Sequence, residues 1–172
     1  MISSSLCYIE KNGMYLLIHR VKKKNDFNEG KWIGVGGKFE EDETADECVV
    51  REVFEETGLT LTEFHMVGVI KFYSNKTEDQ DMFLYKATDF TGKLKEDCPE
   101  GYLKWVPADE VLKLPTWEGD HFFIDPLLQG RTNLNMTVKY EGDVLTEFID
   151  ETASVTIETA SNIKSAHGFS TE

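Results

Sequence analysis

Apolar and polar residues alternate with the two-residue period of β-strands over much of this chain. Residues 6–10 and 14–20 form two such runs, and the Asn12-Gly13 pair between them is typical of a tight hairpin turn. In the second run both alternating sets are largely apolar, which predicts a strand buried on both faces. The N-terminal part should therefore form a hairpin inside a covered sheet.

Further runs of the same kind predict more strands, separated by turns and by two substantial helical segments. Residues 74–80 and 91–99 are polar enough to be a turn and a loop, respectively. Short strands around such helices favour an α/β fold, with a mixed sheet between helices on both sides. The further predicted strands are 31–37, 64–73, 81–88, 102–106, 133–140 and 144–149. One helix lies between a cap at Thr44 and a cap at Gly58, a short one is 107–114, and another helical stretch is 121–129.

The helix predicted from residue 44 has clear start and stop signals. Thr44 and Glu47 form a capping box, and Gly58 stands where a left-handed C-terminal cap is expected. Three glutamates of this helix fall within an arc of about 100°; they are Glu52, Glu55 and Glu56. Carboxylates crowded in this way repel one another unless a hard divalent cation such as Mg²⁺ neutralises them. The pattern therefore predicts a metal site, and a solvated charged helix is the alternative.

Composition bounds the possible partners. The chain has 172 residues, which suits one domain, and we place its boundaries at residues 1–150. The net charge of −14 argues against binding to duplex nucleic acid, which needs a basic footprint. An acidic protein can still bind a polyphosphate when bound cations invert the local potential. Residues 151–172 are rich in Ser, Thr and Ala, and we interpret them as a C-terminal tail of open role.

Cysteine usage and hydropathy indicate a reducing compartment. The three cysteines, Cys7, Cys48 and Cys98, are widely spaced and form neither a CxxC pair nor a Cys/His cluster, so no zinc site or disulfide framework is predicted. The first residues do not resemble a signal peptide, and no apolar run is long enough to span a bilayer. We expect a cytoplasmic protein without a membrane partner, either a monomer or a homodimer.

The spacing of charged residues and glycines around the acidic helix matches a known motif. Gly37 is followed by Glu43 after five residues, then after seven by Arg51-Glu52, and finally by Glu55-Glu56 and Gly58. This looks like a complete Nudix box. The resemblance extends from about residue 4 to 150 and is closest to the MutT-like branch, the oxidised-purine nucleoside triphosphatases. Shared features outside the box include Lys23, Phe27, Trp32, Trp105, Trp117 and Asp120.

The resemblance implies an α/β/α sandwich and an enzyme. Nudix hydrolases cleave a nucleoside diphosphate linked to another moiety, X, and in the MutT-like branch X is phosphate. A nucleoside triphosphate then becomes a monophosphate and pyrophosphate. The expected substrates are oxidised purine nucleotides such as 8-oxo-dGTP, whose removal supports DNA repair. Alternatives are another X, as in dinucleoside polyphosphates, ADP-ribose or 5′-triphosphorylated RNA, and a non-catalytic nucleotide-sensing module.

The resemblance also assigns roles by motif position. Glu52, Glu55 and Glu56 would be metal ligands together with the Gly37 carbonyl, and the metal would be Mg²⁺, with Mn²⁺ as a substitute. Glu100 matches an additional acid near the metal, although an exposed loop glutamate is the alternative reading. The general base is left open by the motif, and we favour Glu52. Arg51 would orient the glutamates and count among the catalytic residues.

Substrate recognition is predicted from four residues outside the box. Lys23 would contact a phosphate, Phe27 and Trp117 would offer apolar faces to the base, and Asp120 would hydrogen-bond a purine edge. Packing in the core is the alternative for the two aromatic residues. Related enzymes include members with Asn at the position of Ile33 and Asp at that of Gly119. Because this chain lacks both polar groups, strict 8-oxo-guanine selectivity is left open.

Overall fold

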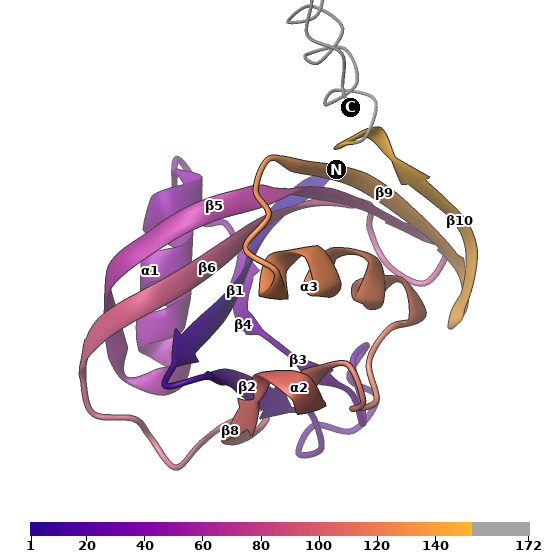
Figure 1. Ribbon diagram of the computed structural model, residues 1–172. Coiled ribbons are helices and arrows are strands. Elements are labelled where there is room, and N and C mark those ends of the chain that lie inside the picture. Colours follow the sequence, from indigo (N-terminus) through magenta and orange to yellow (C-terminus); the bar gives the residue numbers. More distant parts are fainter. Residues whose placement is uncertain (153–172) are drawn as a thin grey trace, which may run out of the picture.

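The computed structural model describes residues 1–152, and the predicted tail beyond residue 152 lies outside the described residues (Figure 1). Short loops join the strands and helices in chain order. The strands are β1 (Ile2–Lys11), β2 (Met14–His19), β3 (Trp32–Ile33), β4 (Val35–Lys38), β5 (Leu59–Ser74), β6 (Gln80–Gly92), β7 (Asp97–Cys98), β8 (Gly101–Pro107), β9 (Leu134–Glu141) and β10 (Val144–Asp150). The helices are α1 (Ala45–Thr57), α2 (Ala108–Val111), the 3₁₀ turn η1 (Glu118–Asp120) and α3 (His121–Leu128).

The described strands form one mixed sheet, as predicted. Its order is β10-β9-β5-β6-β1-β2-β8-β7, with β3 paired to β2 and β4 paired to β1. Strand β1 runs parallel to β6 and antiparallel to β2 and β4, and β5 runs parallel to β9. Because β1 is bordered by β6 on one side and by β2 and β4 on the other, it lies at the centre of the sheet.

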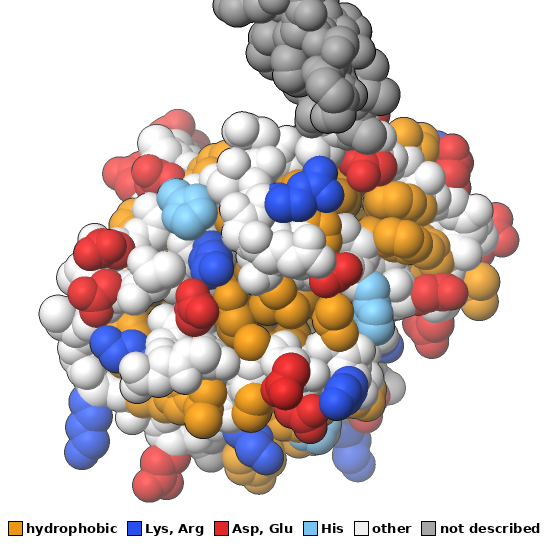
Figure 2. Space-filling model, viewed as in Figure 1, with side chains coloured by type: hydrophobic (Ala, Val, Ile, Leu, Met, Phe, Trp, Pro, Cys, Tyr) orange, Lys and Arg blue, Asp and Glu red, His pale blue; other side chains and the backbone are white. Residues whose placement is uncertain are grey.

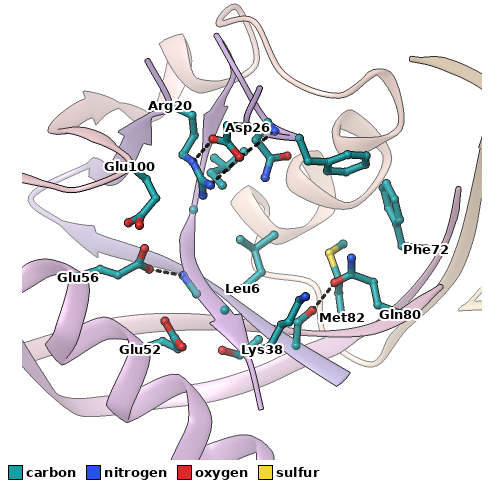
Figure 3. Close-up of a pocket in the computed structure, with 18 of the residues that line it drawn as sticks. Leu6, Arg20, Asp26, Lys38, Glu52, Glu56, Phe72, Gln80, Met82 and Glu100 are labelled. Carbon is teal, nitrogen blue, oxygen red and sulfur yellow. Dashed lines mark hydrogen bonds and ion pairs between the residues drawn. The ribbon is translucent and has the colours of Figure 1, made fainter. Parts of the chain in front are cut away.

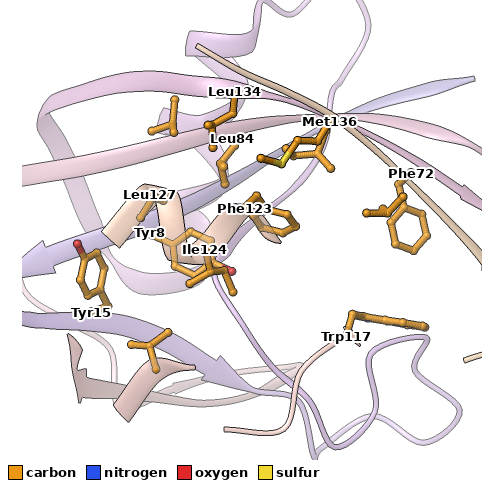
Figure 4. Packing of buried hydrophobic residues seen from close by; sticks show 14 of the residues in the cluster. Tyr8, Tyr15, Phe72, Leu84, Trp117, Phe123, Ile124, Leu127, Leu134 and Met136 are labelled. Atoms are coloured by element: carbon orange, nitrogen blue, oxygen red, sulfur yellow. The ribbon is translucent and has the colours of Figure 1, made fainter. Parts of the chain in front are cut away.

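Two apolar cores lie on opposite faces of this sheet, which confirms the predicted sandwich. Cys7 and Ile9 of β1 face one core and Tyr8 faces the other, and β2 alternates in the same way. Helix α1 covers the first face with Val49 and Val53. Helix α3 fills the second face (Figure 4), where Phe123, Ile124 and Leu127 pack with Tyr8, Phe72, Leu84, Leu134 and Met136.

Local signals in the sequence correctly gave the start and end of α1. The Thr44 hydroxyl accepts from the Glu47 N–H at 3.1 Å, and the Glu47 carboxylate accepts from the Thr44 N–H at 2.9 Å. Gly58 has a φ of 82° and caps the C-terminus. The hairpin at Asn12-Gly13 is also confirmed, with φ values of 52° and 77°. These features depend only on neighbouring residues.

Several predicted boundaries were wrong, most of them because distant partners decide where an element begins or ends. Strand β5 begins at Leu59, not at residue 64, since residues 59–63 pair with the end of β6. The predicted loop 91–99 contains that end of β6 and also β7, which pairs with β8. The predicted strand 31–37 is divided into β3, paired to β2, and β4, paired to β1. Helix α2 stops at Val111 because the next N–H groups bond to carbonyls three residues back.

Charged side chains of both signs are scattered over the visible surface (Figure 2). On that face basic groups stand singly among acidic ones and do not gather into the patch that duplex nucleic acid would require. None of the helices in the described part of the chain is long and apolar enough to cross a membrane.

Candidate active site

A cavity of about 730 Å³ lies where α1, β4 and the loop after β2 meet (Figure 3). Carboxylates of α1 and of the loop before β8 line one end. Aromatic and apolar side chains line the other end, and basic side chains lie between the two. This distribution suits a ligand that is anionic at one end and planar and apolar at the other. The lining includes Arg20, Lys23, Phe27, Lys38, Glu52, Glu56, Glu100, Trp117 and Asp120.

Two glycines of β4 allow α1 to approach the sheet closely. A Cβ on Gly36 would lie 1.9 Å from the backbone oxygen of Ser5 in β1, and a Cβ on Gly37 would lie 2.5 Å from Glu52 Cδ. The Gly36 N–H donates to Glu56 Oε1 at 3.0 Å. Strand β4 therefore fits between β1 and the two glutamates only because these positions carry no side chain.

Arg51 joins the acidic residues of the box into one network. Its Nε and Nη2 donate to both oxygens of Glu43, at 2.6 and 2.9 Å. Its Nη1 donates to Glu52 at 2.8 Å and to Glu55 at 3.1 Å, and Nη2 also donates to the Lys38 carbonyl. The guanidinium lowers the pKa of Glu43 to about 2. Arg51 is thus placed to orient Glu52, as its motif position implied.

Glu52 and Glu56 are partly withdrawn from solvent and lie near another acid. The pKa of Glu56 is raised to about 8, mainly by burial and in addition by the nearby charges of Glu52 and Glu100. Burial also raises the pKa of Glu52, against the opposing effect of Arg51. Carboxylates in this arrangement repel one another without a counter-charge. Their oxygen atoms are the donors that a hard divalent cation such as Mg²⁺ prefers, so the residues present fit such an ion.

Glu55 is arranged differently from the other two glutamates of the helix. Its side chain is 55% exposed, it pairs with Arg51, and it does not line the cavity. The position of the three glutamates on one arc of the helix therefore suggested a closer grouping of their carboxylates than the structure has. Glu100, by contrast, lines the cavity, and its carboxylate lies within 4.8 Å of that of Glu56. The prediction that Glu100 joins the acidic cluster agrees with this placement.

Two basic residues to which the sequence analysis assigned no role face the same cavity. Arg20 donates from Nε and Nη2 to both oxygens of Asp26, at 2.7 and 2.9 Å, and both side chains are largely buried. Its positive charge lowers the pKa of Glu56. Lys38, which directly follows the two glycines, also lines the cavity, as does the predicted Lys23. The position of Arg20 at a strand end before a loop was the only sequence signal for it.

The apolar end of the cavity is built from the predicted aromatic pair. Phe27 and Trp117 stack on each other with ring centroids 4.7 Å apart. Trp117 is buried, its Nε1 donates to Asn28 at 2.7 Å, and the Lys31 ammonium lies 4.3 Å above its ring. Both rings line the cavity while packing in the core, and their role in binding a base stays a prediction.

Asp120 lies at the same end and is 6% exposed. Its Oδ2 accepts from the Thr116 hydroxyl at 2.7 Å. Burial raises its pKa to about 7, and this effect outweighs the hydrogen bonds from Thr116 and from the backbone. The carboxyl therefore exchanges its proton near neutral pH and can donate or accept a hydrogen bond.

Comparison with known proteins fits this geometry. The NUDIX domain family model matches residues 3–126, which include every site residue described above. The chain belongs to the Nudix family. Its Nudix box therefore lies in the structural context that the family shares, a loop and helix packed on a mixed sheet, and the predicted family and fold are confirmed.

Relatives of this Nudix domain include named hydrolases. An oxidized purine nucleoside triphosphate hydrolase of Danio rerio is 34% identical over 127 residues, covering 73% of this chain and 80% of the fish protein. An uncharacterized Nudix hydrolase, YvcI of Bacillus subtilis, is 28% identical over 138 residues, covering 78% and 84%. Among solved structures, a MutT protein from Bacillus halodurans matches with a TM-score of 0.79 and 28% identity, over 88% of this chain and 99% of that one. The chain is thus similar to Nudix nucleoside triphosphate hydrolases.

Proposed function

We propose that this Nudix hydrolase is a divalent-metal-dependent pyrophosphohydrolase that converts a nucleoside triphosphate to a monophosphate and pyrophosphate. Oxidised purine nucleotides such as 8-oxo-dGTP are its proposed substrates. The observation that carries the proposal is the single cavity, which has carboxylates at one end and an aromatic pair with a buried acid at the other. The similarity to oxidized purine nucleoside triphosphate hydrolases supports the same substrate class.

Glu52, Glu56 and Glu100 would hold the metal, with contributions from Glu55 and the Gly37 carbonyl. A bound Mg²⁺ supplies charge neutralisation at the phosphates and lowers the pKa of water. Glu52 is our choice for the general base, because it lines the cavity and Arg51 holds one of its oxygens in place. The Gly36 N–H holds Glu56 through Oε1.

The phosphate chain would lie against Arg20, Lys23 and Lys38. Arg20 uses two of its nitrogens to bind Asp26, and its third nitrogen is left for a phosphate oxygen. Asp26 also accepts from the Asn28 N–H, and Asn28 in turn accepts from Trp117. One loop therefore connects the proposed phosphate-binding residue to the proposed base-binding end.

The base would stack on an outer face of the aromatic pair. A base inserted between the two rings needs about 7 Å between them, twice the ~3.5 Å contact distance of stacked carbon atoms, and Phe27 and Trp117 are 4.7 Å apart. Asp120 would hydrogen-bond the purine edge through Oδ1, since its Oδ2 already accepts from Thr116. Ile33 and Gly119 add no polar side chain here, so discrimination between purines falls mainly to Asp120.

A hydrolysis panel with pyrophosphate and orthophosphate detected separately tests this function. The purified protein should release pyrophosphate from 8-oxo-dGTP with Mg²⁺ or Mn²⁺, at a higher kcat/KM than from dGTP. Equal kcat/KM values would remove the oxidised-purine specificity but leave the chemistry intact. Preferential cleavage of a dinucleoside polyphosphate, ADP-ribose or 5′-triphosphorylated RNA would assign the same residues to a different X. Thermal stabilisation by nucleotides without any turnover would indicate a sensor.

A further inference from the structure

Cys98 lies beside two carboxylates that line the acidic end of the cavity, Glu56 and Glu100, although its sequence spacing gave no sign of this. It lies in β7, which pairs with β8 so that Cys98 stands opposite Gly101. This pairing brings its sulfur together with carboxylate oxygens of Glu56 and Glu100, and the three atoms lie within 4.8 Å of one another. In Figure 3 the carboxylates of Glu56 and Glu100 face each other across the cavity end.

The surroundings of Cys98 differ from those of the other two cysteines. Its side chain is 3% exposed, and no acceptor for its S–H lies within hydrogen-bond distance among the described residues. Burial raises the pKa of Cys98, and hydrogen bonds from the backbone N–H groups of Glu100 and Gly101 act in the opposite direction by favouring the thiolate. Cys48, in contrast, contacts the Ser5 hydroxyl and the Gly37 carbonyl, and Cys7 lies in the apolar core. Of the three cysteines, only Cys98 has both an S–H group without an acceptor among the described residues and two carboxylates close to its sulfur.

We propose that Glu56, Cys98 and Glu100 form a binding site for a thiophilic divalent cation of the zinc class. Sulfur is a poor ligand for Mg²⁺, whereas Zn²⁺ binds cysteine and carboxylate together, often with three protein ligands and one water. Ligand atoms around one tetrahedral zinc are roughly 3.5 Å apart, as its bond lengths of about 2.0–2.3 Å require. The present separations, at most 4.8 Å, need to close by up to about 1 Å to reach this, and Glu100 lies in the turn before β8. The thiol proton passes to solvent as the sulfur–metal bond forms.

This site overlaps the proposed magnesium site, because both use Glu56 and Glu100. Zinc bound there would withdraw two carboxylates from the cavity and inhibit hydrolysis. That consequence depends on the proposed function, whereas the binding of zinc does not. Sequence spacing predicted no zinc site because two of the three ligands are carboxylates and one lies on a helix more than forty residues away.

Binding is tested with Cd²⁺ alone, whose bond to a thiolate gives an ultraviolet charge-transfer absorption. Titration of the metal-free protein should produce this band in the wild type and in Cys48→Ala, and no band in Cys98→Ser. Calorimetric titration with Zn²⁺ should show at least about tenfold weaker binding by Cys98→Ser, since even the hydrogen-bond partners of metal ligands contribute that much. Absence of the band in the wild type, or its persistence in Cys98→Ser, would overturn the proposal.

Inhibition is tested by adding Zn²⁺ at a fixed Mg²⁺ concentration. With each rate expressed relative to the same protein without zinc, the Zn²⁺ concentration that halves the rate should be at least about tenfold higher in Cys98→Ser than in the wild type. In Cys48→Ala it should be close to the wild-type value. Equal zinc sensitivity in all three proteins would overturn the overlap of the two sites. A protein that binds Cd²⁺ through Cys98 but hydrolyses no nucleotide would refute the proposed function and leave the zinc-class site standing.

Discussion

Gly37 and Glu52 are in direct contact, and a Cβ on Gly37 would lie 2.6 Å from Glu52 Oε1. The atom in the way is the end of a flexible side chain, so Gly37→Ala should displace the carboxylate at little cost in stability. We expect turnover to fall roughly 100-fold, since a misplacement of about 1 Å has effects of that size. The unfolding free energy should change by less than about 1 kcal/mol. Steady-state kinetics and denaturant titration measure the two effects.

Gly36→Ala provides the matched comparison. Its Cβ would meet the backbone oxygen of Ser5 at 1.9 Å, and this oxygen cannot rotate away. The substitution should therefore cost at least about 1–3 kcal/mol of stability by forcing β4 away from β1. If Gly37→Ala were the more destabilising of the two, the Glu52 side chain would not be free to move aside. If Gly37→Ala kept full activity, the close packing of β4 against Glu52 would not matter for function.

Arg20 should contribute to binding through a phosphate oxygen. Arg20→Lys keeps the positive charge but loses the paired hydrogen bonds to Asp26, so the charge is no longer held in place. We expect KM for a nucleoside triphosphate to rise roughly tenfold, because hydrogen bonds to charged groups contribute about 1.5–3 kcal/mol. Arg131→Ala, at an exposed position beyond α3, is the control and should leave KM unchanged. An unchanged KM in Arg20→Lys would count against the assignment.

Asp120 should make stability depend on pH. Its pKa is raised from 3.8 to about 7 in the folded protein, so the folded state keeps a proton that the unfolded state has lost. This contribution to stability is complete below pH 4 and declines as pH rises toward 7, by at most about 1.4 kcal/mol per pH unit. Asp120→Asn cannot titrate. The unfolding free energy of Asp120→Asn relative to that of the wild type should therefore increase between pH 5 and 7 and level off above pH 7. Denaturant titrations at several pH values measure this difference, and a difference that does not change with pH would contradict the prediction.

Phe27 distinguishes base stacking from core packing. The rings of Phe27 and Trp117 both line the cavity, but Trp117 is buried, so Trp117→Ala would lower the stability of the fold as well as any affinity for the base. Phe27 is only partly buried and is the better residue to replace. Phe27→Ala should raise KM for purine nucleoside triphosphates roughly five- to 100-fold, as stacking contributes about 1–3 kcal/mol per base. The value of kcat should change little. An unchanged KM would assign Phe27 to packing alone.

The sequence predicted those parts of the fold and site that depend on short spacing. The capping box of Thr44 and Glu47, the Gly58 cap and the Asn12-Gly13 turn are local, and each has its predicted form. Arg20 and Cys98 could not be predicted in this way. Arg20 faces the cavity because Asp26 returns from a loop to bind it, and Cys98 reaches Glu56 because β7 pairs with β8. The early start of β5 likewise depends on its pairing with β6.

The central claim is that the Glu52–Glu56–Glu100 cluster holds a divalent cation for pyrophosphate-bond hydrolysis. Glu56→Gln tests it most directly, because the amide oxygen can still accept from the Gly36 N–H while the charge is lost. Pyrophosphate release from 8-oxo-dGTP should require Mg²⁺ in the wild type and should fall by at least about 100-fold in Glu56→Gln, which should unfold at a similar temperature. Undiminished pyrophosphate release by the folded variant, or by the wild type with all divalent cations chelated, would contradict the account.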